Sequence, residues 1–296
     1  MKLRNSFLLL STLFCMFMTA CQKEVNVDDN FVPTPTTDSN YLDKIYDIYD
    51  DGSGVDTQNI SVCRYDNLKR LTAINDSVYN SDKITFTYYY NSTDTLPYKS
   101  MYTDEFTAGS DTEIVYHYYN TNQQKIKDSI IKSYYSNGLG SQAVSVQVVN
   151  YSYAPGKMFG ELVKTGINSA SAPVYSRDTA ILDANNNIIS SVDYTLSGST
   201  YVLNRTSGFT YDNHPNPFSR LNIFKSYNRF PNGETLFWEI MCYNNILTQY
   251  EETLPPNPYI FDPVFTLTYK QNGFPASNST GSGATLDTEA YTYKSL

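Results

Sequence analysis

Histidine is the usual base for a serine or cysteine nucleophile, and this chain has two, His117 and His214. His117 lies in the alternating run YHYY, where we expect its ring either to pack or to point outward. His214 lies in a proline-rich turn, and no Gly-x-Ser-x-Gly elbow occurs in the sequence. The sequence therefore predicts no catalytic residue of this kind.

Acidic side chains could bind calcium or hydrolyse a glycoside. An EF-hand beginning at Asp47 would place Tyr49 third and Gln58 twelfth, so that motif fails, and a looser calcium site stays a minor alternative to a solvated loop. Glu239 beside Trp238 is the most enzyme-like acid, although alternation alone predicts a strand with this glutamate outward. Because close pairs of cysteine or histidine are also missing, we predict no metal site and no cofactor. The candidate calcium loop contains Asp47, Asp50, Asp51, Gly52, Ser53 and Asp56.

The first 20 residues have the parts of a secretory signal peptide. Lys2 and Arg4 are basic, residues 7–18 are almost wholly apolar, and Ala20 is a small residue at the expected cleavage site. The tetrapeptide Met18-Thr19-Ala20-Cys21 resembles the lipobox of bacterial lipoproteins, with methionine in place of the commoner leucine. The resemblance implies cleavage before Cys21 and a lipid on its thiol. We therefore expect a membrane contact through this lipid anchor.

Residues 21–40 are polar, acidic and rich in proline and threonine, which is typical of a flexible tether. Their acidic residues behind Cys21 resemble the surface-export signal of Bacteroidota lipoproteins, and a plain solvated spacer is the alternative. The expected location is the outer membrane, at its periplasmic face or at the cell surface.

Cys63 and Cys242 are the two cysteines left once Cys15 departs with the signal and Cys21 carries the lipid. In an oxidising compartment they could form a disulfide. Two buried free thiols, which pack as small hydrophobic side chains, are the alternative.

The charge balance excludes some partners. The chain has 21 basic and 30 acidic residues, a net charge of −9, whereas nucleic acid is bound by clustered lysine and arginine. We therefore predict no nucleic-acid partner. After Cys21, no apolar run approaches the roughly 20 residues of a membrane-spanning helix.

Residues 41–296 form one repetitive all-β domain by their composition and pattern. The chain has 28 tyrosines and 15 phenylalanines, and runs such as ITFTYYY (84–90) and AVSVQVVNYSY (143–153) alternate between apolar and polar residues. Clusters of Asn, Asp, Gly, Ser and Pro separate these runs and predict turns. No long stretch has helical spacing, so we expect little helix.

A repeat underlies the domain. Eight segments each place a strand-ending residue, usually tyrosine, before a short polar turn, at intervals of 24 to 35 residues. A unit of this length accommodates two strands and a tight turn. We predict an antiparallel meander of about eight β-hairpins in a twisted and curved sheet, open or partly closed. The segments begin at Tyr65, Tyr89, Tyr118, Tyr153, Leu182, Tyr211, Tyr243 and Tyr269.

Three stretches carry a resemblance to known families. Residues 65–74, YDNLKRLTAI, resemble a YD (Rhs-type) repeat. Residues 209–218 and 267–275 resemble segments of uncharacterised Bacteroidota lipoproteins of the DUF4595 kind. The resemblance implies a repetitive β fold and an envelope location, and it brings no catalytic residues to this chain.

These observations predict an envelope protein that binds or scaffolds and is not an enzyme. Its partner would be a glycan or another envelope protein. A glycan-binding accessory lipoprotein of a polysaccharide-uptake system is the first alternative, because tyrosine rings stack on sugars. A hydrolase that uses carboxylates in the loops is the less favoured one.

Overall fold

The computed structural model describes residues 41–50, 52, 54–78, 83–136, 140–166, 173–219, 221, 242–254, 258–282 and 285–296. The chain divides into two compact units, Met1–Val32 and Pro33–Leu296, and every described element belongs to the second. The predicted signal peptide, the lipid-bearing Cys21 and the tether lie outside the described residues.

Seventeen strands are described, and no helix occurs among the described residues. No helix of the described part is therefore long and apolar enough to cross a membrane. The strands are β1 (Tyr41–Asp50), β2 (Val55–Tyr65), β3 (Leu71–Val78), β4 (Lys83–Tyr89), β5 (Lys99–Phe106), β6 (Gly109–Tyr119), β7 (Lys125–Ser136), β8 (Gly140–Ala154), β9 (Lys157–Gly166), β10 (Val174–Leu182), β11 (Ile188–Ser197), β12 (Thr200–Pro215), β13 (Asn244–Thr253), β14 (Tyr259–Phe261), β15 (Thr266–Tyr269), β16 (Pro275–Ser282) and β17 (Thr285–Lys294).

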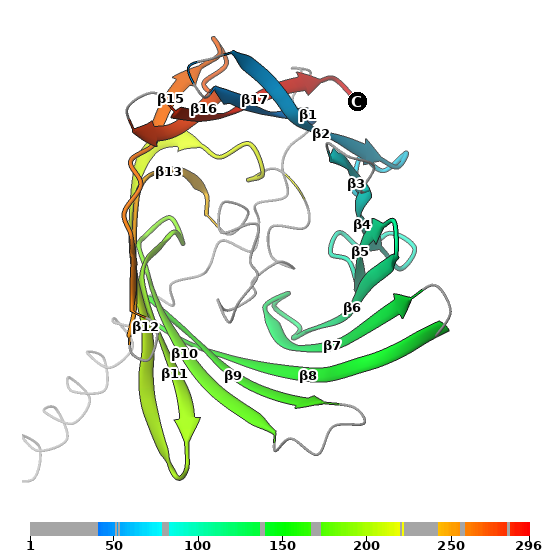
Figure 1. Cartoon of the computed structure of the whole chain (residues 1–296), viewed down its shortest axis with the longest axis vertical. Coiled ribbons are helices and arrows are strands. Elements are labelled where there is room, and N and C mark those ends of the chain that lie inside the picture. The colour runs from blue at the N-terminus through cyan, green and yellow to red at the C-terminus, as the bar shows by residue number, and fades with distance from the viewer. Residues whose placement is uncertain are drawn as a thin grey trace, which may run out of the picture. The chain divides into compact units, whose positions relative to one another are not determined.

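All strands belong to one antiparallel sheet, which curls until β17 pairs with β1 (Figure 1). From β1 to β14 each strand pairs with the next one in the sequence, and β15, β16 and β17 form a second consecutive series. β14 pairs with β13 and β15 pairs with β16, but no ladder joins β14 to β15. The prediction of a curved antiparallel meander is therefore confirmed.

One face of the sheet is buried, and it is the concave one. Cys63, Ile74 and Phe86 are partners across β2, β3 and β4, and their side chains are 1%, 2% and 6% exposed. Phe218, from the segment after β12, packs among them, and Figure 1 shows this yellow segment turning to the inside of the curl. We call the concave face the inner face and the opposite one the outer face.

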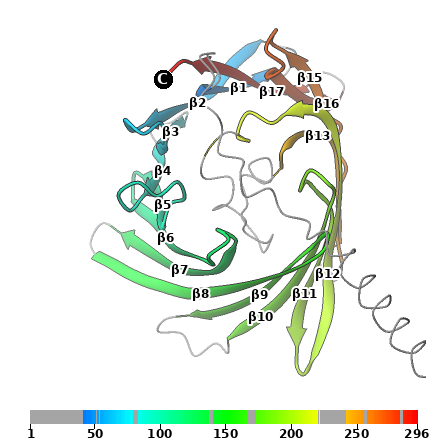
Figure 2. The ribbon, with the colours of Figure 1, turned by 180° about the vertical axis from the view of Figure 1, so that it is seen from behind.

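The inner face carries two apolar clusters. One joins residues of β1–β4 and β17 with Phe218 and Leu221, and the other extends from Val115 on β6 to Ile246 on β13. Figure 2, seen from behind, shows the same strands enclosing the interior. Strand alternation therefore places one set of side chains inside and the other outside, as expected for strands with period two.

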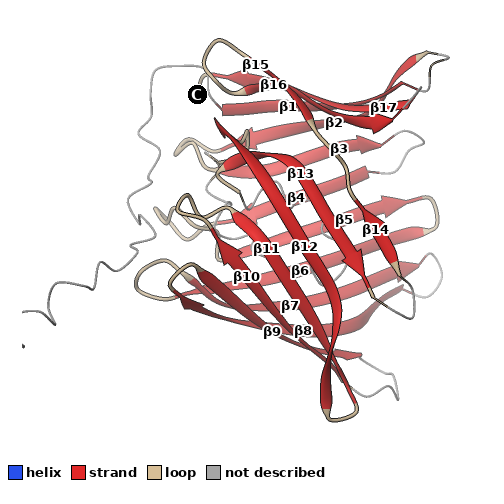
Figure 3. Ribbon diagram, turned by 90° about the vertical axis from the view of Figure 1, so that its left-hand side faces the viewer, coloured by secondary structure: helices blue, strands red, loops and turns tan. Residues whose placement is uncertain are grey.

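Four of the eight predicted segments fold as the same tight turn. In the first, the backbone N–H of Asp66 donates to the carbonyl of Arg70 and the N–H of Lys69 donates to the carbonyl of Asp66. The fourth residue has positive φ in each turn, which matches a type I turn followed by a G1 bulge. These turns lie along one end of the sheet, because the strands alternate in direction (Figure 3). They begin at Asp66, Asn120, Asp183 and Lys270.

Tyrosine hydroxyls donate hydrogen bonds to backbone carbonyls of neighbouring strands at the end of the sheet where these turns lie. Tyr65, for example, donates to the carbonyl of Leu42 over 2.7 Å, and Tyr211 donates to the carbonyl of Ile188 over 2.6 Å. A net contribution of about 1 kcal/mol is typical of one such bond. Much of the unusual tyrosine content therefore has a structural role. The other tyrosines that donate in this way are Tyr90, Tyr119, Tyr153 and Tyr293.

Candidate functional site

A buried polar network lies on the inner face of β5, β6, β7 and β8. The Nδ1 of His117 is 2.8 Å from Oδ1 of Asp128, its direct partner across the strands, and its Nε2 is 2.9 Å from Oγ of Ser100. The other carboxylate oxygen of Asp128 accepts from Lys125 Nζ over 3.2 Å and from the Tyr151 hydroxyl over 2.9 Å. We call these five residues the His117 network.

The His117 network holds Asp128 ionised. Burial alone raises the pKa of Asp128, but the charge of Lys125, the charge of His117 and the hydrogen bonds from His117 and Tyr151 together lower it below its usual value. Lys125 and Asp128 each have side chains only 1% exposed, so their ion pair is fully buried. Removing one member would leave the other as an uncompensated buried charge.

Ser100, His117 and Asp128 have the hydrogen-bond order of a hydrolytic triad. In such a triad the serine must meet a substrate, whereas Ser100 is 6% exposed and the side chain of His117 only 3%. Lys125 also ion-pairs with the carboxylate that would orient the base. The geometry therefore suits a structural network better than a reaction centre.

A second polar group on the inner face contains two opposed acids. Asp178 on β10 and Asp193 on β11 are direct partners across the strands and are 2% and 1% exposed. Burial first, and then the neighbouring Asp193, raise the pKa of Asp178 to about 9. Arg205, opposite Asp193 on β12, acts in the other direction and ion-pairs with Glu251 over 3.4 Å. Asp178 therefore favours its protonated form at neutral pH.

The outer face carries charged residues in the middle of its strands. Arg177 on β10 is paired with Glu161 on β9 at 3.2 Å, and their side chains are 56% and 60% exposed. The same transverse row continues through Asn150 and Lys127 to Tyr118 on β6, where the ammonium lies 5.3 Å from the ring centroid. We call this the charged row.

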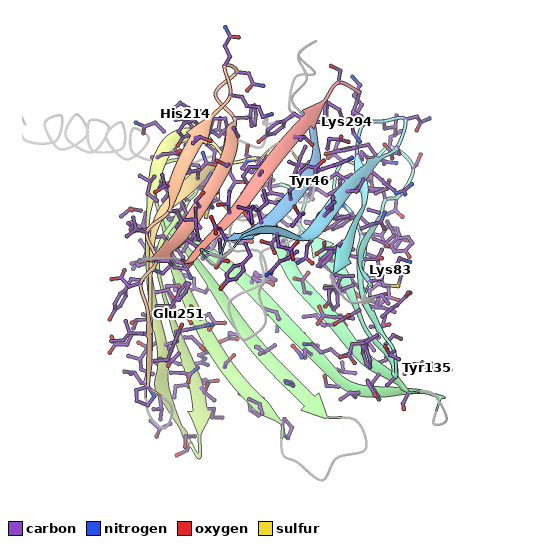
Figure 4. All side chains as sticks on the ribbon, turned by 45° about the horizontal axis from the view of Figure 1, so that its top comes forward. Tyr46, Lys83, Tyr135, His214, Glu251 and Lys294 are labelled. Atoms are coloured by element: carbon purple, nitrogen blue, oxygen red, sulfur yellow. The ribbon has the colours of Figure 1, made fainter. Side chains whose placement is uncertain are left out.

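Elsewhere on the sheet, ion pairs are exposed or half-buried. Figure 4 shows Glu251 on β13 and Lys83 on β4 at opposite sides of the curl. The pair of Lys83 with Glu105 spans 3.9 Å, and both side chains are more than half exposed. Such a pair contributes little to stability.

The histidines predicted to be unreactive differ in their surroundings. His117, expected to pack or to point outward, packs in the His117 network. His214 is exposed, and its ring centroid lies 4.2 Å from that of Tyr269. The hydroxyl of Tyr269 donates to Asp212, which also accepts from the backbone of His214. His214 therefore belongs to a turn-stabilising cluster at the end of the sheet.

The candidate calcium loop is only partly described. Asp47 lies within β1 and accepts from Asn59 over 3.2 Å, and Asp50 accepts from the backbone of Gly52. Asp51 and Ser53 lie outside the described residues, as do Trp238 and Glu239. Within the described ranges, no group of three or more His, Cys, Asp or Glu side chains could hold a metal ion.

Cys63 and Cys242 are buried thiols that are not joined to each other, so the disulfide considered from the sequence is not formed in this structure. Cys63 packs in the cluster of β1–β4, and Cys242 packs in the cluster of β6–β13. The sheet does curl, as a disulfide would have required, but it places the two cysteines in different parts of the inner face. The two cysteines therefore match the alternative to a disulfide, in which each thiol packs as a small hydrophobic side chain.

The tyrosines with exposed rings lie on several strands and loops. Tyr116 and Tyr118 are on the outer face of β6, and the most exposed is Tyr259 at 56%. The glycan platform considered from the sequence would need several of these rings side by side. The exposed tyrosines of the described part are Tyr98, Tyr116, Tyr118, Tyr134, Tyr135, Tyr175, Tyr250, Tyr259 and Tyr269.

Sequence reasoning missed the members of both buried groups other than His117. One signal was present for Asp128, because it lies two residues from Ile130 in an alternating run and therefore shares its face. Nothing in the linear order indicated that Asp128 would oppose His117, or Asp178 oppose Asp193. Cross-strand register decides both pairings.

No family model matches the chain, and no curated protein is significantly similar to it. Twelve chains of solved structures match its fold. A porin-like protein from Bacteroides vulgatus has a TM-score of 0.51 at 8% identity, over 87% of this chain and 100% of the other. One from Bacteroides uniformis has a TM-score of 0.36 at 11% identity, over 88% and 100%. The first likeness shows a shared fold and nothing more.

Proposed function

We propose that this chain is a lipid-anchored protein of the bacterial cell envelope that binds a ligand on its inner face without chemical turnover. The thiol of Cys21 carries the lipid, residues 21–40 form the tether, and the curled sheet stands in water. The sequence pattern of residues 1–21 supports the anchor. The likeness to a porin-like protein supports an envelope location.

The charged row is the observation that supports a sheet standing in water. It runs across β6 to β11 on the outer face and places Glu161 and Arg177 at mid-strand, whereas Lys127 lies near the start of β7. In a sheet embedded in lipid, an outward lysine or arginine near mid-membrane would cost about 2–4 kcal/mol. The porin-like fold alone would favour a pore through the membrane, and the charged row opposes that alternative.

Replacing the anchor cysteine tests the proposal. In a bacterial host that modifies lipoproteins, we expect the unchanged protein to take up a fatty-acid probe and to sediment with membranes. Cys21→Ala should lose the label and move to the soluble fraction, because the acyl chains are the proposed membrane contact. Fractionation followed by immunoblotting measures both effects.

Cys15→Ala is the matched control, since it changes a cysteine in the same segment and should leave labelling and sedimentation as they are. Cys21→Ala protein that still needs detergent for its release would contradict the proposal. That result would favour a sheet embedded in the membrane.

A hydrolase is the second candidate, because Ser100, His117 and Asp128 have triad geometry. A fluorophosphonate probe, which reacts with activated serines, tests it directly. We expect no labelling, since Ser100 is almost fully buried. Labelling that disappears in Ser100→Ala and in His117→Ala would instead establish an activated serine and a catalytic function.

A further inference from the structure

The charges of the sheet are divided between its two ends. One end holds the four tight turns and the first residue of β1, Tyr41, because the strands alternate in direction. Figure 4 shows two of its residues, His214 and Lys294, at the top and Tyr135, from the other end, lower down. We call it the basic end, because several of its cations are at least partly exposed and form no ion pair with a described acid. They are Arg64, Lys69, Lys99, Lys127, Lys157 and Lys270.

Acidic side chains at the basic end are mostly engaged. Asp66 forms an ion pair with Arg70 over 2.7 Å, and Asp43 forms one with Lys294 over 2.8 Å. Asp183 accepts from backbone N–H groups of its own turn. Among the described residues, the unpaired cations of this end therefore outnumber the acidic side chains that have no ion pair. Those acids are Asp94, Asp183 and Asp212.

The opposite end of the sheet is acidic, with exposed Asp56 on β2, Asp111 on β6 and Asp287 on β17. On the inner face there, Asp111 lies directly opposite Asp104 on β5. A strand of ten residues, such as β1, is about 33 Å long. The Debye length at about 0.1 M salt is about 10 Å, so these acids are screened from whatever the basic end contacts. The net charge of −9 therefore does not prevent the basic end from binding an anionic partner.

Apolar side chains accompany the cations in the loops of the basic end. Leu68, at the tip of the first turn, is 50% exposed and precedes Lys69, and Tyr98 is 38% exposed and precedes Lys99. Tyrosine is enriched where a membrane meets water, because its ring is apolar and its hydroxyl is polar. A lysine beside it keeps its ammonium in water while its stem lies along apolar surface. These loops therefore combine the two properties that suit a lipid headgroup region.

We propose that the basic end docks on an anionic lipid surface. Its lysines belong to loops that follow different strands, so a single phosphate ion would meet one of them, whereas a lipid surface meets them together. The proposal deepens the proposed function and rests on it, because the lipid on Cys21 brings the chain to the membrane. A flexible chain as long as residues 21–40 spans about 25 Å on average and joins the sheet at this end, so weak contacts suffice for docking. The lysines that meet the lipid are Lys69, Lys99, Lys157 and Lys270.

Fluorescence quenching on the full lipidated chain in vesicles tests the proposal. Asn67→Cys places a dye at the exposed tip of the first turn, while Cys63 and Cys242 stay buried and unlabelled. A nitroxide on the lipid headgroup quenches the dye only at short range. We expect quenching in vesicles of equal parts phosphatidylcholine and phosphatidylglycerol to exceed that in phosphatidylcholine alone several-fold, and to fall to the same level at about 1 M salt. A dye at Thr57→Cys, near the other end of β2, should be quenched weakly in both.

Two lysines of β9 locate the contact, because both are exposed and they lie at opposite ends of one strand. Lys157→Gln, at the basic end, should lower the ratio of docked to undocked chain about fivefold, the effect expected of one lysine near an anionic surface. Lys164→Gln removes the same charge at the acidic end and should dock as the unchanged chain does. Adding Lys69→Gln and Lys270→Gln to Lys157→Gln should abolish the excess quenching.

Equal quenching of the Asn67→Cys dye in both kinds of vesicle would overturn the proposal, and so would equal docking of Lys157→Gln and Lys164→Gln. Neither result bears on the anchor, because the release of Cys21→Ala from membranes is measured separately. Salt releases a chain held by docking alone, whereas a sheet embedded in the membrane needs detergent, so the two are distinguished. Salt-sensitive quenching by a chain that carries no fatty acid would support the docking surface and contradict the anchor.

Discussion

Asp128→Asn is expected to lower the free energy of unfolding by about 3–5 kcal/mol, the range found when one member of a buried ion pair is removed. The substitution keeps the size of the side chain but leaves Lys125, whose side chain is 1% exposed, without its counter-charge. His117 and Tyr151 also lose a carboxylate to which both are bonded. Urea denaturation followed by near-ultraviolet circular dichroism measures the change, because tyrosines pack at the network.

Lys83→Gln is the matched control for Asp128→Asn. It breaks an ion pair whose members are both more than half exposed, and we expect no change beyond experimental error. A second comparison replaces both Lys125 and Asp128 by apolar residues, which should be tolerated much better than Asp128→Asn alone. Equal stability of Asp128→Asn and the unchanged chain would show that the network contributes nothing to the fold.

The same network predicts the response of the protein to acid. The pKa of Asp128 is lowered on folding, so its contribution is present above the unfolded pKa of about 3.9 and is lost as the pH falls through the lower, folded value. Asp128→Asn should therefore lose more stability relative to the unchanged chain at pH 7 than at pH 3.

Asp178→Asn is expected to act in the opposite direction and to stabilise the protein at pH 8. The folded pKa of Asp178 is about 9, above the unfolded value of about 3.9, so the folded state holds a proton that the unfolded state has released. Its contribution is present below about pH 4 and is lost as the pH rises toward 9. Asparagine is neutral like protonated Asp178 but does not titrate, so its contribution to stability does not fall as the pH rises.

The gain from Asp178→Asn should increase as the pH rises from 4 toward 9, because the unfolded chain releases a proton that the folded state keeps. Thermal unfolding at pH 4, 6 and 8 measures the trend. Asp111→Asn, an exposed inner-face acid, should show no such trend. A constant difference between Asp178→Asn and the unchanged chain at all three pH values would mean that Asp178 titrates normally.

The repeat could be predicted because its causes are local. An acid or amide at the first turn position accepts from backbone N–H groups two and four residues later, as Asp66, Asn120 and Asp183 do. These side chains act within the turn itself. The residues that follow Tyr65, Tyr118, Leu182 and Tyr269 therefore specify their turns locally, without contacts from distant parts of the chain. The other four predicted segments do not form this turn, and the sequence pattern alone did not distinguish them from the four that do.

Strand alternation likewise indicated which residues share a face, but it left open which face is concave. The curl depends on β17 pairing with β1, between residues about 240 positions apart in the chain. No short-range pattern encodes such a contact. A disulfide between Cys63 and Cys242 was one way to close the sheet, and hydrogen-bonded ladders bring about the curl without it.

By itself, the sequence determined the strand period, the turn chemistry, the absence of familiar catalytic motifs and the expectation of an anchor at Cys21. Those features follow from the identities of neighbouring residues. Only the tertiary structure decided that Asp128 opposes His117 and that Asp178 opposes Asp193. Such pairs are fixed by the register between strands, and a shift of one residue would send every one of these side chains to the other face.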